Sequence, residues 1–152
     1  MNDTAPITNW LRYDDRLTTS GQPTETQLEG LAALGVTHVI NLALHTHELA
    51  LEDERASVEA LGMHYTHIPV AFDNPTEHDF NAFCAALQAA GESNTHIHCI
   101  MNWRVTAFLF RFQRDMLGMD ASAARAQMER IWTPTRGDDP SFASWVKFIA
   151  PH

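Results

Sequence analysis

Three short apolar runs alternate with helix-like segments along this chain. The runs cover residues 37–44, 64–70 and 95–100, and each is short enough to be a buried strand. Parallel strands need a crossover of a dozen or more residues between them, usually a helix, and the segments between these runs meet that requirement. The sequence therefore predicts an α/β fold, with three layers and a mostly parallel central sheet flanked by helices.

Further elements are expected around this centre. Residues 9–21 are typical of two short strands joined by a polar turn at Asp14 and Asp15. Thr24 and Thr76 are predicted N-caps, and Asp79 completes a capping box with Thr76. No repeat or linker divides the 152 residues, so a single domain is expected over 1–152. We expect helices within residues 24–35, 48–62, 72–91, 104–118, 120–132 and 140–150.

The composition excludes several classes of protein. The formal net charge is −9. Nucleic acids and anionic membranes are bound by basic surfaces, so neither is expected as a partner. No apolar stretch reaches the ~18 residues of a membrane span, and the N-terminus lacks the pattern of a secretory signal, so a cytoplasmic protein is expected. The two cysteines, Cys84 and Cys99, are too few for a disulfide framework or a cysteine-rich zinc site. No cofactor is expected.

The candidate catalytic residues lie at the end of the third run and in the segment after it. Cys99 ends a predicted strand, and ligands of parallel α/β sheets bind beyond such ends. The N–H groups at the start of the next helix are free to face an anion, and Arg104 adds a guanidinium that can grip two phosphate oxygens. Such surroundings favour the thiolate form of a cysteine. Thr106 could donate its hydroxyl to the sulfur and His98 could order the loop, whereas the alternative is a buried, inert thiol.

A family resemblance rests on four stretches: HCIMNWRVTA (98–107), TSGQPT (19–24), VINL (39–42) and IPV (68–70). Together they resemble the cysteine-dependent protein tyrosine phosphatase superfamily over roughly residues 10–115. The most similar part of it is a small bacterial branch like the dual-specificity phosphatases, related to the phosphatase-like domain of β-lactamase-hydrolase-like proteins. The resemblance implies hydrolysis of a phosphomonoester, either on a protein or on a small molecule. It also implies the catalytic residues Cys99, Arg104 and Asp73, and a phosphate-binding loop formed by Ile100, Met101, Asn102, Trp103, Arg104, Val105 and Thr106.

The loop departs from that family's pattern in its arginine. Arg104 stands five positions after Cys99 rather than six, and Val105 takes the usual place of the arginine. Thr106 stands where the family's hydroxyl belongs, and Asn102 replaces a glycine, which it can do because asparagine tolerates positive φ. Either the loop keeps its length with the arginine moved one position, or it is one residue shorter; Asn102 and Thr106 favour the first.

The general acid is sought on a neighbouring loop. Asp73 follows the 64–70 run and lies 26 residues before Cys99. An Asx turn into Asn74 and Pro75 explains Asp73 equally well. Ser20 and Gln22, just before the first predicted helix, are expected to support the pocket as part of its wall.

Three rival functions stay open. The first is a domain that binds a phosphorylated ligand without hydrolysing it, which the position of Arg104, one residue early, permits. The pairs His45 and His47, and His96 and His98, allow a metal-dependent hydrolase, although no dense metal motif such as HExxH is present. Thiol redox chemistry at Cys99 would need Cys84 close by as a resolving cysteine.

Overall fold

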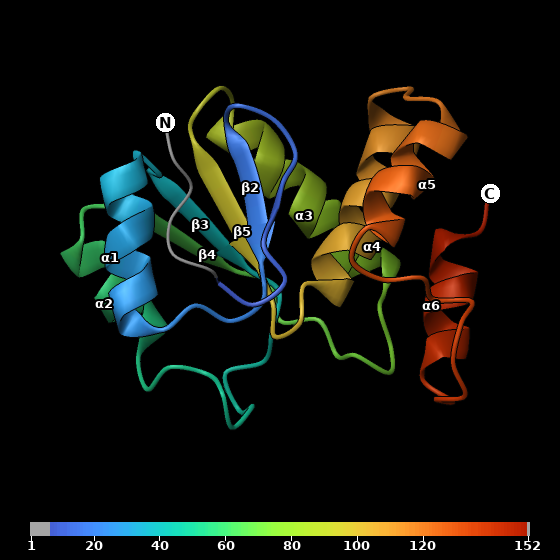
Figure 1. Ribbon diagram of the computed structural model, residues 1–152, viewed down its shortest axis with the longest axis horizontal. Helices are drawn as coiled ribbons and strands as arrows, with labels where there is room; N and C mark the ends of the chain where they lie inside the picture. Colours follow the sequence, from blue (N-terminus) through green and yellow to red (C-terminus); the bar gives the residue numbers. More distant parts are fainter. Residues whose placement is uncertain (1–6, 152) are drawn as a thin grey trace.

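The computed structural model describes residues 7–151 and contains one five-stranded sheet. The strands lie in the order β1-β2-β5-β3-β4, and only β1 runs antiparallel to its neighbour (Figure 1). The expected three-layer, mostly parallel α/β fold is thereby confirmed. The strands are β1 Leu11–Arg12, β2 Leu17–Ser20, β3 His38–Asn41, β4 His64–His67 and β5 Thr95–His98.

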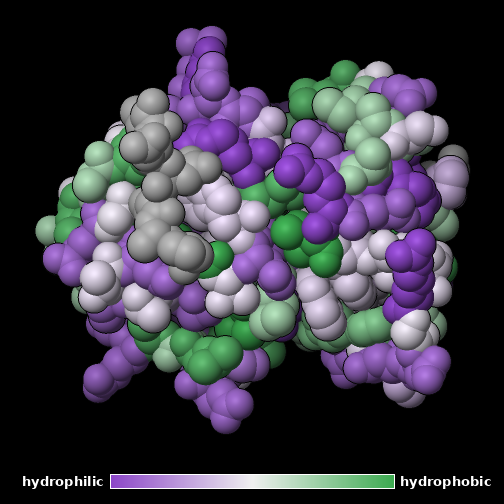
Figure 2. All heavy atoms as spheres, in the orientation of Figure 1, coloured by the Kyte–Doolittle hydropathy of each residue, from purple (hydrophilic) through white to green (hydrophobic). Residues whose placement is uncertain are grey.

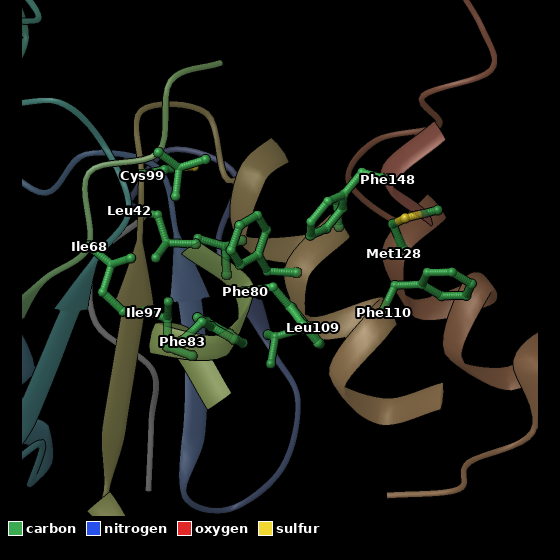
Figure 3. Close-up of a cluster of buried hydrophobic side chains, with 14 of the residues drawn as sticks. Leu42, Ile68, Phe80, Phe83, Ile97, Cys99, Leu109, Phe110, Met128 and Phe148 are labelled. Atoms are coloured by element: carbon green, nitrogen blue, oxygen red, sulfur yellow. The ribbon is translucent and has the colours of Figure 1, made fainter. Parts of the chain in front are cut away.

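Helices cover both faces of the sheet. In Figure 1, α1 and α2 lie on one side, and α3, α4, α5 and α6 lie on the other. Two buried clusters match these layers: Leu28, Val39 and Val58 belong to the first, and Phe83, Ile97 and Phe108 to the second. Figure 3 shows the second cluster, with Cys99 at one end of it beyond Leu42. The helices are α1 Glu25–Leu34, α2 Glu54–Ala60, α3 Glu77–Ala90, α4 Trp103–Arg111, α5 Ala121–Glu129 and α6 Phe142–Ile149.

Local signals set most helix starts. The Thr24 and Thr76 hydroxyls accept N–H bonds from the third residue of α1 and α3, and both capping boxes are complete. Helix α4 is buried along nearly its whole length, as its apolar sequence predicts. It then widens into a π-helix, Phe112–Met116, so the predicted single helix over 104–118 consists of two parts.

The helix predicted over 48–62 is wrong at its beginning. Residues 43–53 form a loop held by the turn bonds His47 N–H to Leu44 O and Ala50 N–H to His47 O. Helix α2 begins at Glu54 because the Asp53 carboxylate caps it, accepting the Ala56 N–H at 3.2 Å. The loop therefore lies at the carboxyl edge of the sheet, next to Cys99.

The surface in Figure 2 is mostly hydrophilic or intermediate, with separate apolar patches rather than one apolar face. Leu49 and Met101 are exposed apolar residues on the loops that follow β3 and β5. Among residues 7–151, no helix is both long enough and apolar enough to cross a membrane.

Candidate active site

A pocket of about 160 Å³ opens at the end of β5. Cys99 is the first residue after that strand, is 1% exposed and lines this pocket. Apolar walls are provided by Phe72, Ile100, Met101 and Trp103, and the polar lining residues are Cys99, Arg104 and His47. The pocket thus combines a thiol, a cation and an imidazole within apolar walls.

The backbone of the cysteine loop leaves a row of N–H groups unpaired. Among the described residues, no hydrogen-bond acceptor is found for the N–H groups of residues 100–105. Asn102 is the N-cap that precedes α4 and has φ +66°, and its side-chain N–H groups bond Asn9 O at 2.8 Å and Thr19 Oγ1 at 2.9 Å. Free N–H groups at the start of a helix form a ready site for an anion.

Arg104 lines the pocket although it comes one position early. The residue is 8% exposed, its Cζ lies 5.5 Å from the centre of the Phe72 ring, and Nη1 reaches Leu42 O at 3.5 Å. Burial lowers the pKa of Arg104, and the charge of Cys99 acts in the opposite direction. Its Nε has no partner within residues 7–151. A buried guanidinium with an unused N–H next to a cysteine can hold an anion against the thiol.

Two residues of the predicted loop are placed differently from the expectation. The Thr106 hydroxyl donates to Asn102 O at 3.0 Å, with Trp103 O at 3.2 Å, rather than to the Cys99 sulfur. Hydroxyls in a first helical turn commonly bond the backbone in this way. Val105 is fully buried in the core and does not line the pocket.

The SGQP stretch supports the loop from behind. Gln22 N–H donates to Ile100 O at 3.0 Å, and Cys99 N–H donates to Ser20 O at 3.4 Å. Gly21 lies so close to Ile100 O that a Cβ at this position would overlap with it. Ser20 and Gln22 therefore contact the loop, but neither lines the pocket, of which they were expected to form part of the wall.

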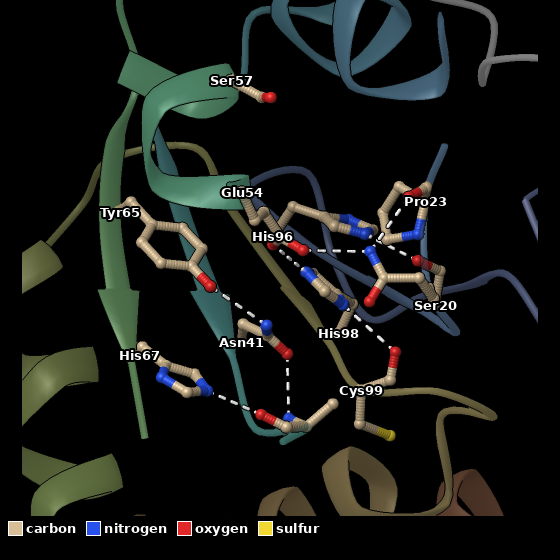
Figure 4. A network of polar contacts seen from close by, with 12 residues as sticks. Ser20, Pro23, Asn41, Glu54, Ser57, Tyr65, His67, His96, His98 and Cys99 are labelled. Carbon is tan, nitrogen blue, oxygen red and sulfur yellow. Dashed lines mark hydrogen bonds and ion pairs between the residues drawn. The ribbon is translucent and has the colours of Figure 1, made fainter. Parts of the chain in front are cut away.

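A buried polar network continues behind Cys99 (Figure 4). His98 bonds Cys99 O through Nδ1 at 3.1 Å and Glu54 Oε2 through Nε2 at 2.5 Å. The other oxygen of Glu54 accepts from Gln22 Nε2 at 3.0 Å. Burial alone would raise the pKa of Glu54, but His98 and Gln22 outweigh it and the pKa is lowered. Sequence reasoning missed Glu54, because the helix was predicted to begin at residue 48 and Glu54 then lies among other acidic residues of a solvated helix.

His47 is a second residue that sequence reasoning assigned to another role. Leu49 N–H donates to its Nδ1 at 3.0 Å, so a neutral His47 carries its proton on Nε2. That nitrogen can then donate a hydrogen bond to a ligand in the pocket.

Asp73 does not line the pocket, although the preceding residue, Phe72, does. The segment is attached to α6: Trp145 Nε1 donates to Phe72 O at 2.5 Å, and Ser144 Oγ donates to Asp73 O at 3.0 Å. Asp73 therefore lies in the loop next to the pocket but does not form part of the pocket wall.

The described residues give little support to the metal and redox alternatives. Within residues 7–151, no three His, Cys, Asp or Glu side chains are grouped so that they could hold a metal ion. Cys84 is buried on α3 among core side chains, and burial raises its pKa. Both cysteines are free thiols.

No protein-family model and no curated protein matches the chain. Solved structures do. A DUF442 protein from Shewanella putrefaciens CN-32, provisionally classed as a phosphatase, is 28% identical, with a TM-score of 0.79 over 94% of this chain and 87% of its own. TpbA of P. aeruginosa, crystallised with phosphotyrosine, is 21% identical, with a TM-score of 0.70 over 93% and 82%. The core catalytic domain of the PP-IP phosphatase SIW14 from S. cerevisiae is 13% identical, with a TM-score of 0.74 over 95% and 88%. The last two show the fold alone.

Proposed function

We propose that the chain, whose fold is similar to that of protein tyrosine and dual-specificity-like phosphatases, hydrolyses phosphomonoesters with Cys99 as the nucleophile. One observation carries the proposal: Cys99 and Arg104 line the same pocket, at the start of a helix whose first N–H groups have no acceptor among the described residues. An inert structural thiol needs none of these neighbours.

The proposed reaction has two steps. The Cys99 thiolate attacks phosphorus, an S–P bond forms, and the P–O bond to the leaving group breaks as that oxygen takes a proton. Water then attacks the cysteinyl-phosphate and releases phosphate and the thiolate. Arg104 and the N–H groups of residues 100–105 would hold the equatorial oxygens in both steps, and His98 would order the loop.

Asp73 is the proposed general acid, which would first protonate the leaving oxygen and then deprotonate water. It directly follows Phe72, which lines the pocket. His47 would add a hydrogen bond to the substrate rather than a proton, since its Nδ1 is engaged as an acceptor. The proposed substrates are phosphorylated proteins or small phosphomonoesters of the cytoplasm, where a free catalytic thiol stays reduced.

Hydrolysis of p-nitrophenyl phosphate tests the proposal. We expect turnover that vanadate inhibits and that Cys99→Ser reduces by about a thousandfold or more. Cys84→Ser is the matched control and should keep the activity, since Cys84 lies in the core. Turnover that survives Cys99→Ser and disappears with a chelator would favour a metal-dependent hydrolase instead.

A second candidate is a module that binds phosphorylated ligands without turnover. The observation that favours it is the absence of any carboxylate among the residues that line the pocket, within the described part of the chain. Inorganic phosphate or vanadate binding measured by calorimetry, lost in Arg104→Met, together with no hydrolysis by the wild type, would select this candidate.

A further inference from the structure

The ring of His98 lies between two hydrogen-bond acceptors. Its Nδ1 is 3.1 Å from the Cys99 carbonyl oxygen, and its Nε2 is 2.5 Å from Glu54 Oε2 (Figure 4). A carbonyl oxygen only accepts, and so does an ionised carboxylate. Both bonds form together when each ring nitrogen carries a proton, which makes the ring an imidazolium.

The Glu54 carboxylate is held in its ionised form. Its side chain is 1% exposed and that of His98 is 0% exposed, so an unpaired charge on either would be costly. Gln22 Nε2 donates to the second oxygen of Glu54 at 3.0 Å, which leaves each carboxylate oxygen with a donor. Hydrogen bonds to the charged form of a carboxylate favour that form.

The other titratable groups around the pair do not replace this partner. His96, on the same strand, stacks 6.4 Å from His98, and its two ring nitrogens face the hydroxyls of Thr18 and Ser20. The Ser20 hydroxyl donates to Gly21 O and therefore accepts from His96 Nε2, so His96 is satisfied as a neutral ring. The remaining ionisable neighbours of the pair are His45, His67 and Tyr65.

We propose that Glu54 is a positioning residue that keeps His98 doubly protonated and so stabilises the Cys99 thiolate. The pair is neutral as a whole, but its positive end faces the Cys99 carbonyl and its negative end lies farther away on α2. Such a dipole next to a thiol favours the thiolate. The protonation of His98 is independent of the proposed phosphatase function, and only the benefit to the nucleophile rests on it.

The state of His98 can be read by NMR of protein with 15N-labelled histidine rings. At about pH 7.5, where an unperturbed histidine is neutral, both His98 nitrogens should show the shifts of protonated nitrogens. The signals are assigned by their loss in His98→Gln. One unprotonated ring nitrogen on His98 in the wild type would overturn the proposal.

The effect on Cys99 is measured by its alkylation with iodoacetamide across pH, in a Cys84→Ser background. Glu54→Gln should leave one His98 nitrogen unprotonated and move the midpoint of Cys99 alkylation upward by about one pH unit. Glu77→Gln is the matched control, because it weakens the ion pair between the exposed Glu77 and the buried Arg111, away from the pocket, and should leave the midpoint unchanged. An unchanged midpoint in folded Glu54→Gln would overturn the proposal.

Neither readout needs turnover, so a protein without phosphatase activity could still pass both tests. Conversely, an active enzyme whose His98 is singly protonated would refute only this inference. If Glu54→Gln fails to fold by circular dichroism, the wild-type NMR experiment alone decides.

Discussion

At the residue scale, the shape of the cysteine loop depends on Gly21 and Asn102. Gly21 is buried against the Ile100 carbonyl, where no Cβ has room, and its φ is not positive. Asn102 adopts φ +66° and ties the loop to Asn9 and Thr19. The first residue matters for its lack of volume, and the second for its backbone conformation and its amide.

Gly21→Ala tests the close approach. The added methyl group would push the Ile100 carbonyl away, and overpacking of this kind costs about 1–3 kcal/mol of unfolding free energy. Because Ile100 lies in the cysteine loop, we also expect most hydrolysis of p-nitrophenyl phosphate to be lost. Urea denaturation and initial rates measure the two effects.

Gly62→Ala is the control for Gly21→Ala. Gly62 has φ +82° and nothing within 4 Å of an added Cβ, so only backbone strain of about 1 kcal/mol is expected, without loss of activity. If Gly21→Ala kept full activity and lost no more stability than Gly62→Ala, the contact with Ile100 would not matter.

Sequence reasoning found the residues of the site that form a local pattern. Cys99, Asn102 and Arg104 lie within six residues of one another, and a positive φ at Asn102 was predicted from its position. Glu54 and His47 could not be placed at the site, because both are far from Cys99 in the sequence: Glu54 begins α2, and His47 lies in the loop that follows β3. Their contacts exist only once β3, β4 and β5 are paired.

At the scale of elements, β5 carries two buried histidines in different surroundings. His96 lies between two hydroxyls, whereas His98 faces a carboxylate and a carbonyl. Strand positions were predicted well because short apolar runs between turns are a local signal. The start of α2 was predicted wrongly, because the cap at Asp53 and the burial of Glu54 outweigh the helical composition of residues 48–52.

Because His96 is neutral in the folded chain, we expect the unfolding free energy to depend on pH. Burial holds the pKa of His96 well below 6.5, so the ring is neutral in the folded chain. Above pH 6.5 it is neutral in both states and has no effect. As pH falls below 6.5, only the unfolded chain gains the proton, and the unfolding free energy decreases, by about 1 kcal/mol between pH 7.5 and 5.5.

Urea denaturation of the wild type and His96→Gln at both pH values isolates this effect. The variant is less stable overall, but it should lose about 1 kcal/mol less than the wild type between pH 7.5 and 5.5. The comparison removes the contributions of His38 and His67, whose pKa values burial also lowers. Equal losses in both proteins would show that His96 is not the acid-sensitive group.

At the scale of the whole molecule, distant parts of the chain meet at one pocket. The loop 43–53, the segment 71–75 and the cysteine loop all follow strands at the carboxyl edge of the sheet. The net charge of −9 gives no general attraction for a phosphate, so the anion must be held by Arg104 and the loop N–H groups. Helix α6, near the C-terminus, contacts this site through the segment that carries Phe72 and Asp73, and through Phe142, whose ring centre lies 5.8 Å from that of Trp103.

Trp145→Phe tests whether α6 holds that segment in place. The change keeps an apolar ring in the core but removes the N–H that bonds Phe72 O, which leaves a partly buried carbonyl unpaired at a cost of about 1 kcal/mol. We expect faster amide exchange in residues 71–75 and slower hydrolysis of phenyl phosphate, whose leaving group needs an acid. Asp73→Asn should lower the same rate by about a hundredfold, if Asp73 is that acid.

Trp132→Phe is the matched control, because the Trp132 indole N–H is buried in the same aromatic cluster and has no partner within residues 7–151. Its removal should change neither amide exchange in residues 71–75 nor the rate. p-Nitrophenyl phosphate separates the causes further, since its better leaving group depends less on an acid and should be affected less by Asp73→Asn and Trp145→Phe. A Trp145→Phe protein that matches Trp132→Phe in exchange and rate would show that the segment keeps its position without α6.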